Sequence, residues 1–310
     1  MNRPDDSSLT PQQLATVEKC ADRLLREASA FDIFPTPVDR ILAAAKLTVV
    51  EDKFLDNSVL NQFMQMAKSS MGAVKSALSK VLGLLYIPDR LVLLDLSAPP
   101  KRKPFLKLHE AGHSTLPHQS KMYALIHDSE DSLDPYITDL FEREANVFAA
   151  ETLFQGARFA SEAHDSSFGM KVPLELSGKF GASNYATFRR YVTTNPSACC
   201  VIVLNPPTLG NGNAFNAQIR RTIVSQTFNT IFDPLDFGLE ITNAHYLGHL
   251  VPARRKMTGR RQIKMHDRNG TSRSCSAEAF NSTHHMFILI RDEGPAPTVS
   301  FPSVRFRPSA

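Results

Sequence analysis

Residues 105–113 read FLKLHEAGH and contain the pattern H-E-x-x-H, formed by His109, Glu110 and His113 with Ala111 and Gly112 between them. On a helix, positions i and i+4 share one face, so His109 and His113 can offer two imidazole nitrogens to one zinc ion. Glu110 then lies beside the first histidine, where a carboxylate can take a proton from a water held by the metal. The alternative interpretation is a helix whose histidines simply lie on the surface. The surrounding sequence has to distinguish this helix from a zinc-binding one.

A catalytic zinc site needs a third protein ligand and leaves one position open. The helix predicted over 134–154 offers two candidates, Glu142 and Glu144. Glu142 shares a face with small residues that permit close helix packing, whereas Glu144 shares a face with apolar residues that can equally be buried. Periodicity therefore favours Glu142 only slightly, and two solvated glutamates remain a further alternative.

These segments together resemble one family. FLKLHEAGH followed about thirty residues later by EREANVFAAETLF (142–154) is similar to the ImmA/IrrE family of metallo-endopeptidases. IFPTPVDRILAAAKLTVVED (33–52) is similar to that family's opening helix and strand. LLDLSAPPKRKPFLKLHEAGH (93–113) is similar to its strand, proline-bearing loop and active-site helix. The resemblance covers about 31–160 and implies a mostly helical, zincin-like core with a small sheet in an α+β chain.

The resemblance also implies residue roles. The glutamate of the family's E-x-x-A-N-x-F-A segment falls on Glu142, which gives His109, His113 and Glu142 as metal ligands and Glu110 as general base. Asn146, one turn later, becomes a residue that orients a ligand by hydrogen bonding. Zinc is the expected cofactor, although a His-His-Glu site also accepts other divalent ions. The expected activity is cleavage of a protein substrate, a helix-turn-helix repressor, which would relieve repression of stress or mobile-element genes.

Further residues are candidates for handling the substrate. Hydrolysis of an amide needs an electrophile besides zinc, and Tyr123, His127 and Tyr136 between the two segments are candidates, against the interpretation that they are solvated loop residues. His118 follows the expected active-site helix at the place of a family histidine, offset by one residue. The strand expected over Leu91–Leu96 is predicted to be a sheet edge to which a peptide substrate can add.

Composition sets broad limits. The 310 residues are 42% hydrophobic and 21% charged with a net charge of +4, which excludes a disordered or collagen-like chain and suggests about two domains. No apolar run reaches about 18 residues, the first residues lack an apolar signal segment, and four cysteines make no disulfide framework. We therefore expect a cytoplasmic protein with reduced thiols and no membrane segment.

The predicted organisation has four parts. These are an N-terminal helix (1–30), a zinc metalloprotease domain (31–160), a helix-turn-helix-like helical segment (161–196) and a C-terminal α+β domain (197–310). The order of these parts resembles the longer members of the family, whose last domain is GAF-like, and this resemblance implies a GAF-like sensor fold for 197–310, although no sequence motif marks it. Within them we expect helices near 10–29, 56–82, 102–116, 134–154 and 172–194, a hairpin over 84–96, and strands at 47–50, 199–205, 238–244, 262–267 and 286–292. Thr10 and Gln13 predict a capping box for the first helix.

A second hypothesis uses the same sequence differently. The paired helices within 172–194 and eight cations between 254 and 273, with Gly259 as the expected hairpin tip, can serve nucleic acid. The chain would then be a non-proteolytic DNA-binding regulator with a structural metal site, and a solvated basic loop is the plainer interpretation of the cations. An intact Glu110 weighs against this hypothesis. A protease with broad, toxin-like targets is a third.

Overall fold

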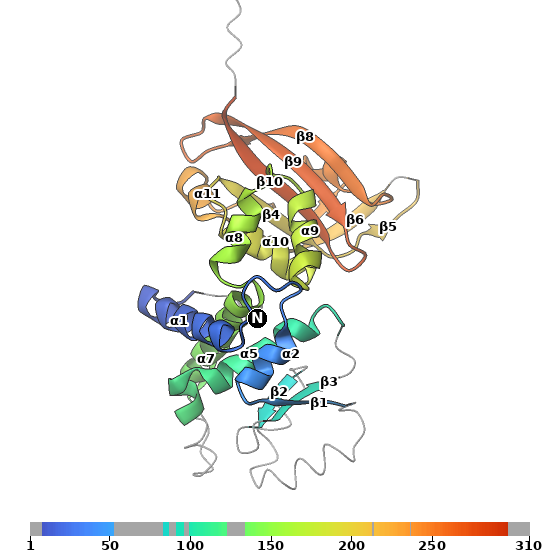
Figure 1. The fold of residues 1–310 in the computed structure, drawn as a ribbon. Helices are drawn as coiled ribbons and strands as arrows, with labels where there is room; N and C mark the ends of the chain where they lie inside the picture. Colours follow the sequence, from blue (N-terminus) through green and yellow to red (C-terminus); the bar gives the residue numbers. More distant parts are fainter. Residues whose placement is uncertain are drawn as a thin grey trace, which may run out of the picture. The chain divides into compact units, whose positions relative to one another are not determined.

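The computed structural model describes residues 8–52, 83–86, 91–95, 99–122, 134–212, 214–235 and 237–296, and it divides the chain into two compact units, 1–187 and 188–310. The first unit is mostly helical and carries a small sheet, and the second is built on a curled antiparallel sheet (Figure 1). The α+β class is therefore confirmed. The helices expected over 56–82 lie outside the described residues, and the finer division into four parts stays a prediction.

The helices of the first unit begin and end close to where the sequence places them. They are α1 (Pro11–Glu27), α2 (Val38–Ala44), α5 (Lys103–Thr115), α7 (Pro135–Leu153), α8 (Ala157–His164), α9 (Lys171–Phe180) and α10 (Asn184–Thr193), the last of which runs into the second unit. The predicted capping box of α1 is present, with Thr10 Oγ1 accepting from Gln13 N and Gln13 Oε1 accepting from Thr10 N. Helix α8 was not expected; Gly156, at a φ of 59°, separates it from α7.

The small sheet has the order β1-β3-β2, from β1 (Thr48–Asp52), β2 (Gly83–Tyr86) and β3 (Leu91–Asp95). The hairpin expected over 84–96 is confirmed, because β2 and β3 pair antiparallel. The prediction that 91–96 forms a sheet edge is wrong: β1 pairs parallel with the other side of β3, so β3 is central. Strand β1 lies about forty residues before β3 in the sequence, so no local sequence pattern indicates that the two strands pair. Among the described strands, β2 is the antiparallel edge.

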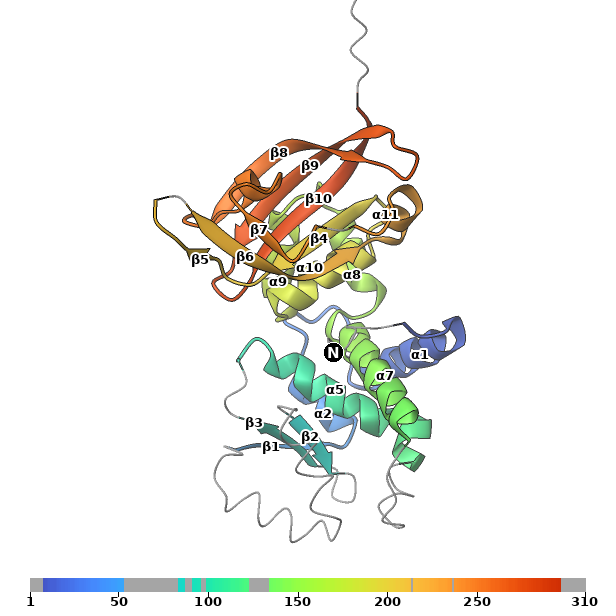
Figure 2. The same cartoon turned by 180° about the vertical axis from the view of Figure 1, so that it is seen from behind.

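Helices α5 and α7 cross at unusually close range (Figure 2 shows them side by side, as does Figure 1). A Cβ placed on Gly112 would lie 3.2 Å from Ala145 Cα and 3.2 Å from Phe148 Cδ1. Gly112 of α5 and Ala145 of α7 are both buried. Two small side chains thus let the backbones approach, and this contact fixes the distance between the H-E-x-x-H segment and Glu142.

The second unit carries β4 (Cys199–Leu204), β5 (Thr208–Leu209), β6 (Phe215–Val224), β7 (Glu240–Thr242), β8 (Met257–His266), β9 (Ser272–Asn281) and β10 (Met286–Pro295). The order is β5-β6-β4-β10-β9-β8, with β7 paired to β6. One sheet face packs under α11 (Gln226–Ile231), the short 3-10 helix η1 (Gly248–Leu250) and nearby loops, through Phe228, Phe232 and Leu250. On the opposite face, Phe287 stacks on Phe188 of α10 with ring centroids 4.5 Å apart.

Two features of the second unit differ from expectation. Strands β6 and β9 were missed, because Arg220 and Arg221 interrupt the apolar pattern of one and SRSCSAEAFN (272–281) lacks β-branched residues. Gly259 is not a hairpin tip, since it lies within β8. The turn that joins β8 to β9 is at Asp267–Thr271, where Gly270 has a φ of 77° and Asp267 Oδ1 accepts from the backbone of Asn269 and Thr271.

The structure also describes the four cysteines and the apolar character of the helices. The four cysteines are free and buried, and burial raises the pKa of Cys199 and Cys275 to about 12, so these two thiols stay protonated. No helix among the described residues is both long enough and apolar enough to span a membrane.

We predict that Gly112→Val separates α5 from α7 and lowers the free energy of unfolding of the first unit by about 1–3 kcal/mol, the usual cost of overpacking. The matched control is Gly178→Val on α9, where a Cβ meets nothing within 4 Å. Because valine is a better helix former than glycine, the control should unfold no earlier than the parent. Scanning calorimetry of the three proteins measures this, and equal losses in both variants would contradict the close-approach argument.

Candidate metal centre

His109, His113 and Glu142 form, among the described residues, a group whose ligand atoms all lie within 4.8 Å of one another. Both histidines are buried on α5, and Glu142 is half-buried on α7. The two Nε2 atoms are 3.2 Å apart, with their rings edge to face. Glu142 Oε2 lies 3.4 Å from His109 Nε2, and Glu142 Oε1 lies 3.7 Å from His113 Nε2. The structure thus brings together the three residues that the resemblance implies as ligands.

These distances fit the donor set to a zinc ion. Zinc bonds to imidazole nitrogen and carboxylate oxygen are about 2.0–2.2 Å long, so two ligand atoms of a tetrahedral site lie about 3.3–3.6 Å apart. The three measured separations scatter around that value. Two imidazoles and one carboxylate also leave a fourth position for water or substrate, as catalytic zinc sites do.

The outer nitrogen of each histidine faces a side-chain amide. His109 Nδ1 lies 3.2 Å from Asn146 Oδ1, and His113 Nδ1 lies 2.7 Å from Gln119 Oε1. An amide oxygen can only accept, so each Nδ1 carries the proton and donates it. When its ring is neutral, each histidine then presents the lone pair of Nε2 to the group, which is the state that binds a metal.

The surroundings shift the pKa values of the two histidines in opposite directions. Burial, with a further contribution from the neighbouring His109, brings the pKa of His113 down to about 4, so His113 is neutral at neutral pH. Burial also disfavours the charged form of His109, but the hydrogen bond to Glu142 and the carboxylates of Glu110 and Glu142 outweigh it and raise the pKa of His109. A proton on His109 is one that an incoming divalent ion would displace.

The two remaining glutamates have distinct positions. Glu110 is buried on α5 next to His109, where its charge acts on that imidazole. Glu144 is also buried, but its Oε2 lies 2.6 Å from both Gln119 Nε2 and His118 Nε2. Glu144 therefore belongs to a neighbouring polar cluster, and Glu142 is the glutamate that faces the histidines.

Of the candidate transition-state stabilisers, the structure describes Tyr136, which lies away from the group. Tyr136 is 72% exposed, and it precedes Glu142 by six residues of α7, about 9 Å along the axis. Tyr123 and His127 lie outside the described residues. Sequence reasoning missed Gln119. Its one available signal was an uncharged amide four residues beyond the end of a metal-binding helix, which is too common to single out.

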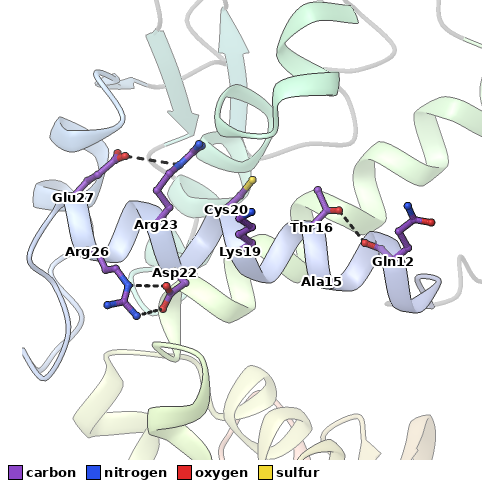
Figure 3. Close-up of a pocket in the computed structure, with 9 residues that line it drawn as sticks. All are labelled: Gln12, Ala15, Thr16, Lys19, Cys20, Asp22, Arg23, Arg26 and Glu27. Carbon is purple, nitrogen blue, oxygen red and sulfur yellow. Dashed lines mark hydrogen bonds and ion pairs between the residues drawn. The ribbon is translucent and has the colours of Figure 1, made fainter.

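A hollow elsewhere in the first unit lies along the outer side of α1 (Figure 3). Its lining includes Lys19, Cys20 and Arg23, and Arg26 pairs there with Asp22. None of the residues that line it belongs to the histidine–glutamate group. Surface ion pairs of this kind contribute little to stability.

Comparisons with known proteins leave the activity open. No family model matches this chain, and no curated protein matches it. Among solved structures, a Mycobacterium tuberculosis transcriptional regulator resembles it with 14% sequence identity and a TM-score of 0.49, over 89% of this chain and 88% of that one. The fold and the site together define an α+β protein with an H-E-x-x-H-type His-His-Glu group that can hold a metal ion. Its activity has to be argued from its own residues.

We predict that the purified parent holds about one zinc per chain and that Glu142→Ala weakens zinc binding by about 100-fold or more, since even residues that only orient ligands are worth 10–100-fold. Elemental analysis and competition with a zinc chelator measure this. Glu162→Ala, which removes a carboxylate paired with Lys179 on α8 and α9, is the control and should keep the zinc. Full retention by Glu142→Ala would remove this residue as a ligand.

Proposed function

We propose that this chain is a zinc-dependent endopeptidase in which His109, His113 and Glu142 hold the metal. The observation that carries the proposal is the three-ligand group with Glu110 buried beside it. A structural metal site needs no base, whereas a hydrolytic site needs a carboxylate beside the metal ligands, and Glu110 is buried directly after the ligand His109. Glu110 therefore favours a hydrolytic site over a structural one.

The residues divide the chemistry between them. When bound, zinc would polarise the peptide carbonyl and acidify a water molecule. Glu110 would hold the proton taken from the attacking water and hand it to the nitrogen of the leaving amine, acting first as base and then as acid. Asn146 holds His109 with Nε2 directed at the ligand position. Burial of Glu110 and the two histidines keeps bulk water from screening these charges.

The substrate would approach along β2 instead of β3. Strand β2 is the antiparallel edge of the described sheet, and α5 packs against it. An extended peptide can pair with such an edge through main-chain hydrogen bonds. This replaces the expectation that 91–96 receives the peptide and keeps the substrate next to the helix that carries Glu110.

The class of substrate follows from the resemblance to ImmA/IrrE endopeptidases. It is a helix-turn-helix repressor, and its cleavage would relieve transcriptional repression, for example in a stress response. The second unit would act as a sensor; a curled antiparallel sheet with loops over one face is compatible with the GAF-like fold predicted for it.

The DNA-binding alternative is weaker. Four of the eight cations between 254 and 273 already bind within the protein: Arg254 to Gly212 O, Arg260 to Glu278, Arg268 to Asn229 O and Arg273 to Asp292. The helix pair at 172–194 is present as α9 and α10, but Arg189 and Arg190 of α10 are half-buried and have interactions within the chain. Cations that are engaged in this way contribute less to phosphate binding.

We predict that Glu110→Gln binds zinc as the parent does but loses peptidase activity, because the amide cannot accept the proton. Zinc-loaded parent and variant are incubated with the proteome of the source organism, and new protein N-termini are identified by mass spectrometry. The expected result is a small set of termini, within helix-turn-helix repressors, that requires Glu110. Identical termini in both samples, together with salt-dependent binding of duplex DNA, would instead support the regulator.

A further inference from the structure

A fully buried amide links His113 to a glutamate that is not part of the candidate ligand set. Gln119 lies in a short helical segment (117–122) after α5, and its side chain is fully buried. Its Oε1 lies 2.7 Å from His113 Nδ1. Its Nε2 lies 2.6 Å from Glu144 Oε2 and 3.3 Å from the carbonyl oxygen of Phe141. Gln119 thus bridges α5 and α7.

The partners of Gln119 fix which way its amide points. The NH₂ group has two hydrogens, and the carboxylate of Glu144 and the carbonyl of Phe141 can only accept them. The reversed amide would place its oxygen against these two acceptors, whichever tautomer His113 adopts. One orientation therefore satisfies every partner, and in it Oε1 accepts from His113 Nδ1.

The buried carboxylate of Glu144 is what anchors the amide. Glu144 is 3% exposed, and its Oε2 also lies 2.6 Å from Nε2 of His118. His118 is partly exposed and approaches the carboxylate from the solvent side. A buried carboxylate needs such donors, and hydrogen bonds to an ionised acceptor are the strong ones. The bridge is consequently held more tightly than a pair of neutral amides would be.

The same helix supports the other histidine. Asn146 of α7 accepts from His109 Nδ1 at 3.2 Å, a longer contact than the 2.7 Å between Gln119 and His113. Helix α7 thus contributes Glu142 directly and controls both imidazoles, one through Asn146 and the other through Glu144 and Gln119. A cluster that served only to fill the core would have no reason to end on the outer nitrogen of each histidine.

We propose that Gln119 is the positioning residue of His113, and that Glu144 acts on the metal site through Gln119. The bridge holds His113 as the Nδ1–H tautomer with Nε2 directed at the ligand position. This inference rests on the proposed function, since it concerns the same metal site. It assigns roles to two residues that contact neither metal nor substrate.

The experiment measures zinc affinity of the full chain by competition with a chromophoric chelator. Gln119→Leu, which keeps the volume and removes the acceptor, should weaken zinc binding 10–100-fold. Glu144→Leu should weaken it less, and Glu144→Gln, which keeps an oxygen to accept from Gln119, should restore most of the loss. Because Glu144 acts through Gln119, the double variant should match Gln119→Leu within about twofold, whereas independent losses would multiply.

A matched control separates positioning from folding. Gln155 is also a buried glutamine of the first unit, and its amide binds the carbonyl oxygen of Ile33 and Thr36 Oγ1. Gln155→Leu should lower the unfolding temperature without weakening zinc binding by the folded chain. A loss of zinc affinity in Gln155→Leu as large as that in Gln119→Leu would mean that any buried defect disturbs the site, and it would overturn the proposal.

A second readout does not use the metal. Long-range proton–nitrogen NMR of zinc-free chain labelled at histidine should show the proton of His113 on Nδ1 in the parent, and a mixed or Nε2-protonated ring in Gln119→Leu. Unchanged zinc affinity and tautomer in Gln119→Leu, in a parent that binds zinc, would overturn the positioning role alone. A parent that binds no zinc would overturn the proposed function, and the positioning role with it.

Discussion

The close approach of α5 and α7 at Gly112 and Ala145 is the contact on which the candidate site depends. H-E-x-x-H places two imidazoles on one helix, but the third ligand stands on another helix, and its distance is set by how near the two backbones come. Any side chain larger than hydrogen at position 112 meets Ala145 Cα and Phe148 at 3.2 Å. The separations of 3.2–3.7 Å between ligand atoms follow from that packing.

Helix α7 does more than complete the ligand set. Within about one turn it presents Glu142 to both histidines, Glu144 to Gln119 and Asn146 to His109, so positions two residues apart serve different parts of one centre. Buried polar groups of this kind are costly unless every donor and acceptor is matched. Here the matching fixes the tautomers of both imidazoles, so the polar cluster and the metal site constrain each other.

The sequence predicts local features better than the contacts between distant segments. Helix ends, the capping box at Thr10 and the proximity of His109 to His113 follow from spacing along one helix. The central position of β3 could not be predicted from the sequence, because its parallel partner β1 lies about forty residues upstream. Strand β9 depends on pairing with both β8 and β10 and not on its own small, polar residues. Gln119 acquires its role only when α7 brings Glu144 beside it.

X-ray absorption spectroscopy of the zinc-loaded full chain tests the central claim most directly, because it reports the atoms bound to the metal. We expect about one zinc per chain, with imidazole nitrogens and oxygen donors at about 2.0–2.2 Å and no sulfur. Scattering from sulfur at about 2.3 Å would assign the metal to cysteines elsewhere in the chain. That result, or a chain that takes up no zinc, would contradict a centre built from His109, His113 and Glu142.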